Sequence, residues 1–115
     1  DELSVSGRTH VVELKGGRIT EFTVEPSDAG LATHPGTAIL GGDATHNAAA
    51  LRQLLAGQKG AYHDIVCLNA AAGLIVAGAT TSLRDGAQIA ASSLADGRAQ
   101  ATLAKLVQQS TAVPS

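Results

Sequence analysis

The fold is decided by residues 64–78, which read DIVCLNAAAGLIVAG. Between Asp64 and Gly78 only Asn69 is polar, so a helix built from this stretch has no face suited to water and belongs inside a larger body. The stretch is also too short to cross a bilayer, which needs about 20 apolar residues. It therefore predicts a buried core helix that neighbouring elements cover on several sides. The amide of Asn69 must then find partners, and we expect a satisfied core amide in preference to a ligand contact.

Two further features of this stretch bear on packing and on location. Residues 70–73 are alanine and glycine, whose small size allows neighbouring backbones to come close. Cys67 is the only cysteine and cannot form a disulfide within the chain, which is typical of a reducing compartment. We interpret Cys67 as a small buried hydrophobic residue.

The totals for the chain limit its size and its partners. A length of 115 residues fits one domain. The chain carries 8 Lys and Arg against 10 Asp and Glu, a net charge of −2, so no basic excess favours nucleic acid as a partner. No signal peptide or transmembrane run opens the chain, and we expect a cytoplasmic protein without a membrane partner. Because methionine is absent and two acidic residues come first, we also expect a piece of a longer chain; removal of an initiator methionine is the alternative.

A β-hairpin is predicted near the start of the chain. Residues 8–14 and 19–25 are rich in Thr, Val and Ile, and the Lys-Gly-Gly-Arg sequence at 15–18 separates them. Paired glycines supply the positive φ angles of a tight turn. At least one face of the hairpin should be largely solvated, since polar residues alternate with the apolar ones. The expected register places Val11 opposite Phe22 and Leu14 opposite Ile19.

The rest of the chain is predicted to be helical after a turn at 26–30 and a loop at 33–37. Asp43 is placed to cap an amphipathic helix that Gly57 ends, and the central helix follows from about Ala61. Ser82, with Asp85 three residues later, resembles a capping box that begins a third helix. Asp96-Gly97 interrupts it, and a fourth helix continues to about Gln109, with residues 110–115 frayed. The predicted fold class is therefore an α+β fragment of an α/β domain, a β-hairpin followed by about four helices.

Few residues carry a recognisable chemistry. The glycines at 41–42 before a helix could present N–H groups to phosphate, but Asp43 would repel it, and a plain capped helix start is favoured. His10, His34, His46 and His63 are interpreted as surface or capping residues, without i,i+4 pairing or a nearby cysteine, so no zinc site is predicted. Motifs for nucleophilic, nucleotide or redox chemistry are absent. We assign no catalytic and no substrate-binding residue.

Asp1 and Glu2 form the one candidate metal site. Two adjacent carboxylates can provide oxygen ligands to Mg²⁺, whose sites use one or two carboxylates together with substrate phosphates and water. A solvated pair of acidic residues without a ligand is the alternative.

Ten short motifs, taken in order, resemble the C-terminal part of the anthranilate phosphoribosyltransferase family, within the catalytic domain shared by nucleoside phosphorylases and phosphoribosyltransferases. The resemblance covers residues 1 to about 106. The motifs are Asp1-Glu2-Leu3-Ser4, the hairpin, Pro26-x-x-x-Gly30-Leu31, Leu40-Gly41-Gly42-Asp43, Asn47-Ala48, Leu55-x-Gly57, Asp64-x-Val66, Leu68-Asn69-Ala70-Ala71, Ser82-Leu83-x-x-Gly86 and Asp96-Gly97-x-Ala99.

The resemblance implies an enzyme of tryptophan biosynthesis. The family transfers the phosphoribosyl group from phosphoribosyl pyrophosphate to anthranilate and releases pyrophosphate, with Mg²⁺ bound by an Asp-Glu pair that matches Asp1 and Glu2. Its phosphate-binding Gly-Thr-Gly-Gly-Asp loop, its Lys-His-Gly-Asn segment and its anthranilate-contacting arginine belong upstream of Asp1. The glycines at 41–42 match a different Gly-Gly-Asp, which opens a helix.

These departures lead to expectations for the isolated segment. Both substrates would bind through the upstream half, so residues 1–115 alone should be inactive, and their uncovered apolar surface should favour association. The full-length protein should be a homodimer, because family members usually dimerise through the N-terminal helical domain. Two alternatives remain: a non-biosynthetic homologue of the same fold with a binding or structural role, and a relative of pyrimidine nucleoside phosphorylase.

Overall fold

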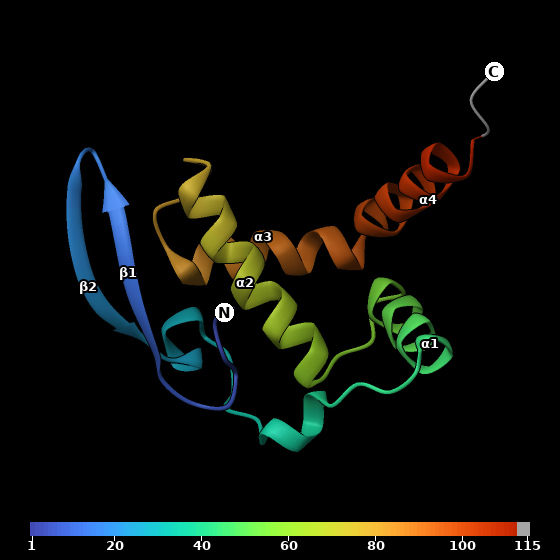
Figure 1. Cartoon of the computed structure of the whole chain (residues 1–115), viewed down its shortest axis with the longest axis horizontal. Coiled ribbons are helices and arrows are strands. Elements are labelled where there is room, and N and C mark those ends of the chain that lie inside the picture. Colours follow the sequence, from blue (N-terminus) through green and yellow to red (C-terminus); the bar gives the residue numbers. More distant parts are fainter. Residues whose placement is uncertain (113–115) are drawn as a thin grey trace.

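A computed structural model of the chain describes residues 1–112, in which a hairpin precedes four α-helices, as predicted. Figure 1 shows the hairpin to one side of the helices, with α2 at the centre. Two short 3-10 helices occupy the region expected to be a turn and a loop. The elements are β1 (Thr9–Lys15), β2 (Arg18–Val24), η1 (Pro26–Ala29), η2 (Gly36–Ile39), α1 (Ala44–Leu55), α2 (Ala61–Val76), α3 (Leu83–Ala95) and α4 (Arg98–Thr111).

The hairpin has the predicted turn and register. Gly16 and Gly17 both adopt positive φ angles, 58° and 77°, which suit glycine in a two-residue turn. Strand β2 is exposed except at Val24, the end of the strand that reaches the core. The expectation that one face of the hairpin is solvated is therefore confirmed. The predicted pairs, Val11 with Phe22 and Leu14 with Ile19, are both formed.

The helix boundaries follow the predicted capping residues with two differences. The Asp43 side chain accepts a hydrogen bond from the His46 N–H (2.8 Å) and caps α1. Ser82 Oγ accepts from the Asp85 N–H (3.2 Å), but only this half of the capping box forms, because the Ser82 N–H donates to Thr80 Oγ1 instead. Helix α4 also continues past Gln109 to Thr111. The predicted fraying thus does not begin at residue 110, and residues 113–115 lie outside the described part.

The core lies where α2 meets α3 and the N-terminal segment. Leu68 and Ala71 of α2 are fully buried, whereas Val76 at its C-terminal end is 88% exposed. The expectation of a helix covered on several sides therefore holds for its first turns and is wrong for its last, where Val76 is exposed and Leu74 and Ile75 are only partly buried. The buried core residues are Val5, Val24, Ala29, Leu54, Leu55, Cys67, Leu68, Ala71, Ala87 and Leu94.

Exposed apolar side chains are found on several different elements of the chain. Leu14 and Leu40 are each 72% exposed, in addition to Val76. Association of the isolated segment remains a prediction that these side chains favour. No helix within residues 1–112 is both long enough and apolar enough to span a membrane.

Helices α2 and α3 approach each other closely at a glycine. A Cβ added to Gly86 would lie 2.8 Å from both Cα and Cβ of Ala71. Neither atom can move without shifting the backbone of α2. The small residues predicted to allow close approach therefore do so at Ala71, and Gly86 provides the matching space on α3.

We predict that Gly86→Ala destabilises the fold, although alanine favours helices by about 1 kcal/mol over glycine. Overpacking of this kind typically costs about 1–3 kcal/mol, so the overlap with Ala71 should exceed the gain. The matched control is Gly73→Ala, since nothing lies within 4 Å of an added Cβ there. In urea unfolding, Gly73→Ala should raise the midpoint and Gly86→Ala should lower it. A raised midpoint for both variants would contradict the close approach.

Candidate functional site

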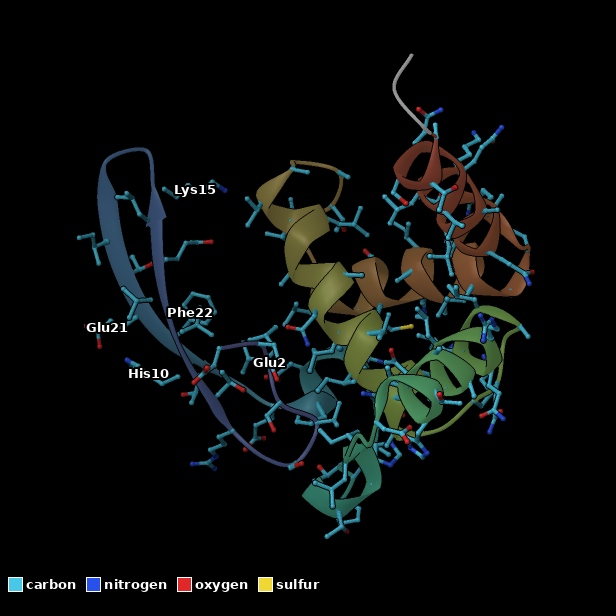
Figure 2. All side chains as sticks on the ribbon, turned by 45° about the vertical axis from the view of Figure 1, so that its right-hand side comes forward. Glu2, His10, Lys15, Glu21 and Phe22 are labelled. Atoms are coloured by element: carbon cyan, nitrogen blue, oxygen red, sulfur yellow. The ribbon has the colours of Figure 1, made fainter. Side chains whose placement is uncertain are left out.

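Asp1 and Glu2 lie at the start of the N-terminal segment that precedes β1. Both residues are exposed, and neither forms an ion pair with another residue in the described part of the chain. Figure 2 shows Glu2 between the hairpin and the helices. Their oxygens are therefore available to a cation.

The donor chemistry fits magnesium in one particular way. Within residues 1–112, no group of three or more His, Cys, Asp and Glu side chains could hold a metal ion, so the described part provides no cage made of protein ligands alone. Mg²⁺ usually keeps several waters and binds through one or two carboxylates and substrate phosphates. Asp1 and Glu2 fit this mode of binding.

The segment that carries these carboxylates is hydrogen-bonded to α2. Leu3 N–H donates to Asn69 Oδ1 (2.7 Å), and Asn69 Nδ2 donates to the carbonyl oxygens of Leu3 and Ile65, both at 2.9 Å. The prediction of a satisfied amide at Asn69 is thus confirmed. Its main partner, a residue 66 positions earlier in the chain, could not be predicted from the local sequence.

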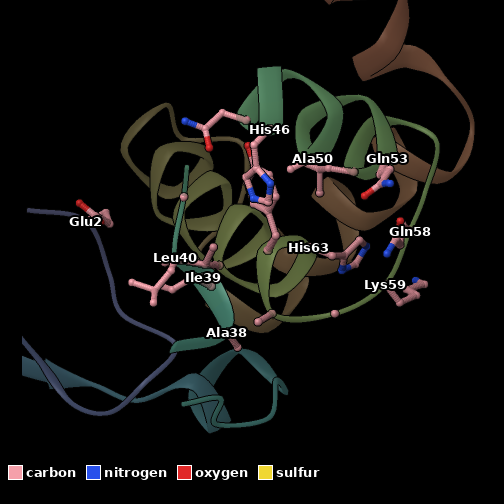
Figure 3. Close-up of a pocket in the computed structure, with 17 residues that line it drawn as sticks. Glu2, Ala38, Ile39, Leu40, His46, Ala50, Gln53, Gln58, Lys59 and His63 are labelled. Atoms are coloured by element: carbon pink, nitrogen blue, oxygen red, sulfur yellow. The ribbon is translucent and has the colours of Figure 1, made fainter. Parts of the chain in front are cut away.

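A cavity of about 580 Å³ lies beside this segment. It is formed by η2, the inner side of α1 and the N-terminal end of α2, and Glu2 lies at one side of it (Figure 3). This volume is typical of small-molecule sites. The polar side chains that line it include His46, Gln53, Gln58, Lys59 and His63.

The Gly-Gly-Asp sequence at 41–43 begins a capped helix and does not form a phosphate loop. The Asp43 carboxylate caps α1, and the side-chain amide of Asn47 binds both the N–H (2.9 Å) and the carbonyl (3.0 Å) of Gly42. Two N–H groups that a phosphate could use, those of Gly42 and His46, are therefore already bonded, and the Asp43 carboxylate lies beside them. The capped-helix interpretation is therefore confirmed.

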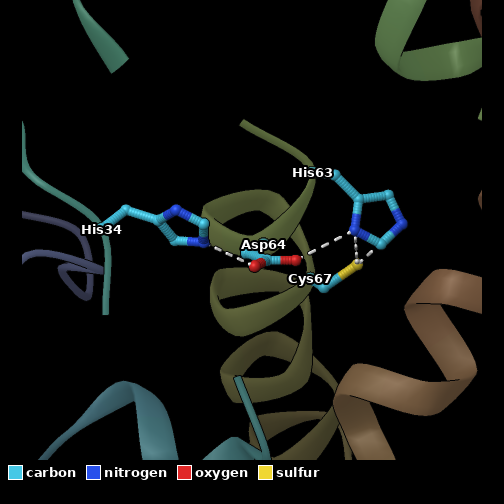
Figure 4. A network of polar contacts seen from close by, with 4 residues as sticks. All are labelled: His34, His63, Asp64 and Cys67. Atoms are coloured by element: carbon cyan, nitrogen blue, oxygen red, sulfur yellow. Dashed lines mark hydrogen bonds and ion pairs between the residues drawn. The ribbon is translucent and has the colours of Figure 1, made fainter. Parts of the chain in front are cut away.

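Four side chains form a polar network at the N-terminal end of α2 (Figure 4). His34 Nε2 lies 2.7 Å from Asp64 Oδ2, and His63 Nδ1 lies 3.2 Å from Asp64 Oδ1. Cys67 Sγ is 3.9 Å from both ring nitrogens of His63. The network joins the loop that contains His34 to α2.

This network corrects two predictions about the histidines. His10 and His46 are exposed, as expected, but His63 is only 5% exposed and His34 is partly buried. The statement that no histidine has a nearby cysteine is also wrong, because His63 and Cys67 are one helical turn apart. That spacing was visible in the sequence. Burial of His63 was not, since it depends on how distant segments pack around the start of α2.

Cys67 is 1% exposed, which confirms its interpretation as a buried hydrophobic residue. Burial, followed by the negative charge of Asp64, raises the pKa of its thiol. The folded chain therefore keeps a proton that the unfolded chain releases near the ordinary cysteine pKa of about 8.5. The stability contributed by this thiol is complete below the unfolded pKa and is lost as pH rises through the folded one.

We predict that Cys67 in the folded chain reacts with Ellman's reagent only as fast as the chain opens, since the thiolate is the reactive form. Stability should also fall at alkaline pH, and the fall should be smaller in the matched variant Cys67→Ala. Labelling rates near neutral pH, with and without urea, and urea midpoints across the alkaline range test this. Immediate labelling of the native chain would contradict the burial.

The family model described as "Glycosyl transferase family, a/b domain" matches residues 1–100, and the chain belongs to this family. A crystal structure of anthranilate phosphoribosyltransferase from Thermus thermophilus matches with a TM-score of 0.84 and 39% identity, covering 94% of this chain and 32% of that one. The hairpin and helices therefore form part of a phosphoribosyltransferase fold, as predicted.

Curated relatives give the same result. The anthranilate phosphoribosyltransferase of Rhodopseudomonas palustris (strain TIE-1) is 48% identical over 112 residues, covering 97% of this chain and 33% of the relative. That of Methylocella silvestris is 50% identical over 110 residues, covering 96% and 32%. The chain thus spans about a third of the length of the curated relatives it matches.

Proposed function

We propose that this chain is the C-terminal portion of the catalytic domain of an anthranilate phosphoribosyltransferase. The full-length protein would transfer the phosphoribosyl group of phosphoribosyl pyrophosphate to anthranilate, with release of pyrophosphate, in tryptophan biosynthesis. The observation that carries this proposal is the similarity to enzymes of that name along nearly the whole chain. The same similarity favours the transferase over a non-biosynthetic homologue or a pyrimidine nucleoside phosphorylase.

The role proposed for this portion is to hold magnesium. Asp1 and Glu2 would bind Mg²⁺ through their exposed carboxylates, beside the cavity that Glu2 borders. Bound Mg²⁺ supplies positive charge that offsets the negative charge developing on pyrophosphate as it leaves. The chain's own contribution is positioning: Asn69 of α2 holds the main chain of Leu3, so the backbone next to the carboxylates does not have to be ordered when substrate binds.

We also propose a cellular location and an oligomeric state for the full-length protein. A cytoplasmic location is supported by the single unpaired cysteine, which suits a reducing compartment. The homodimer rests on the family resemblance alone. The net charge of −2 gives no support to a nucleic-acid partner.

We predict that the full-length protein, supplied with phosphoribosyl pyrophosphate, consumes anthranilate and that this consumption requires Mg²⁺. Loss of anthranilate fluorescence measures the reaction. Residues 1–115 alone should give no turnover, because they contain none of the family's phosphate-loop motifs. Turnover by the isolated segment would contradict this division, and a well-folded full-length protein without activity would contradict the proposed function.

Replacing Asp1 with Asn and Glu2 with Gln in the full-length protein should lower turnover about 10- to 100-fold at limiting Mg²⁺, because neutral amides capture the cation less well. Saturating Mg²⁺ should restore part of the loss. The matched control is Glu21→Gln, which also neutralises an exposed carboxylate, on the hairpin. Unchanged activity of the double variant at limiting Mg²⁺ would exclude the metal assignment.

A further inference from the structure

The side chain of Asn69 binds the main chain of Leu3 in the way that one peptide group pairs with another. Its carbonyl oxygen accepts from the Leu3 N–H, and its amino group donates to the Leu3 carbonyl. A third hydrogen bond joins the amino group to the carbonyl of Ile65, one turn earlier on α2. Both donors of the amide are therefore used, and its oxygen is used as well.

These partners fix the orientation of the amide. The Leu3 N–H can only donate, whereas the carbonyls of Leu3 and Ile65 can only accept. Exchanging Oδ1 and Nδ2 would break all three bonds, so only one orientation of the side chain satisfies them. The Asn69 side chain therefore holds the main chain of Leu3 in one position against α2.

The position of Leu3 determines where the acidic pair can lie. Glu2 is covalently attached to Leu3, and Asp1 is next to it, while neither has a regular secondary structure of its own. On the other side, the segment is held by Ser4 N–H bonding to Thr9 Oγ1 (3.0 Å) and by the Val5 carbonyl accepting from His34 N–H (2.8 Å). Of these three attachments, the one between Leu3 and Asn69 is made at the residue closest in sequence to the carboxylates.

We propose that Asn69 is a positioning residue for divalent-cation binding by Asp1 and Glu2. This inference rests on the proposed function, since it requires that the two carboxylates bind the cation. Without the hydrogen bonds to Asn69, the N-terminal segment would have to be ordered when the cation binds. The conformational entropy lost in that ordering would weaken cation binding. Partners that orient metal ligands typically contribute about 10- to 100-fold in affinity.

The test measures Mn²⁺ binding to the full-length protein by electron paramagnetic resonance of the free ion, without substrates. Asn69→Leu removes all three hydrogen bonds at similar size and without a change in charge, and it should weaken Mn²⁺ binding by about 10- to 100-fold. The matched control is Asn47→Leu, which removes two similar hydrogen bonds between a side-chain amide and the main chain of Gly42. The control should leave Mn²⁺ affinity within about twofold even if both variants lower the melting temperature.

A second variant keeps the inference testable if Asn69→Leu does not fold. Asn69→Asp retains the oxygen that accepts from Leu3 and loses both donors, so the segment should be released while a negative charge is added. Added charge alone would strengthen cation binding, and therefore about tenfold weaker binding would identify lost positioning. Unchanged or tighter Mn²⁺ binding by Asn69→Asp would overturn the inference.

The double variant Asp1→Asn, Glu2→Gln separates this inference from the proposed function. If Asn69 acts through the two carboxylates, adding Asn69→Leu to the double variant should cause no further loss of Mn²⁺ affinity. Wild-type binding that the double variant leaves unchanged would overturn both the metal assignment and this inference. Binding that the double variant weakens but Asn69→Leu does not would overturn this inference alone.

Discussion

The close approach of α3 to α2 at Gly86 and Ala71 is the constraint on which the rest of the structure depends. A Cβ added to Gly86 would lie 2.8 Å from Ala71, so the two helices can pack this closely only with glycine at position 86. The remaining elements then assemble around α2. The base of the hairpin, the N-terminal segment and the end of α1 all bring residues to the core that this pair creates.

Helix α2 also carries the polar side chains that hold distant segments of the chain. Its buried side joins α3, its N-terminal turns hold His63 and Asp64 in a polar network, and Asn69 holds the segment that leads to the acidic pair. The one polar side chain within its apolar run is thus an attachment point for a distant part of the chain. In the proposed site, hydrogen bonds to α2 hold the main chain next to the two carboxylates.

Much of the fold could be predicted from the sequence because its signals are local. The Gly16-Gly17 turn, the Asp43 cap and the break at Gly97 each act within a few residues, and each is found where expected. The burial of His63 and the partner of Asn69 depend instead on contacts between distant segments, and no local pattern contains them. The apolar run also led to a wrong prediction, because it indicates that a helix should be buried but not whether another segment packs on it. Val76 at the end of α2 is exposed.

The candidate site also combines features that the sequence reveals with contacts between distant segments that it does not. Asp1 and Glu2 were predicted as a metal site from their adjacent carboxylates and from the family resemblance, whereas the hydrogen bonds between Asn69 and Leu3 became visible only in three dimensions. The most direct test of this account is an anomalous difference map from crystals of the full-length protein grown with Mn²⁺. We predict a manganese peak in contact with the carboxylates of Asp1 and Glu2, with Leu3 hydrogen-bonded to Asn69. A manganese peak at another site, away from both carboxylates, would contradict it.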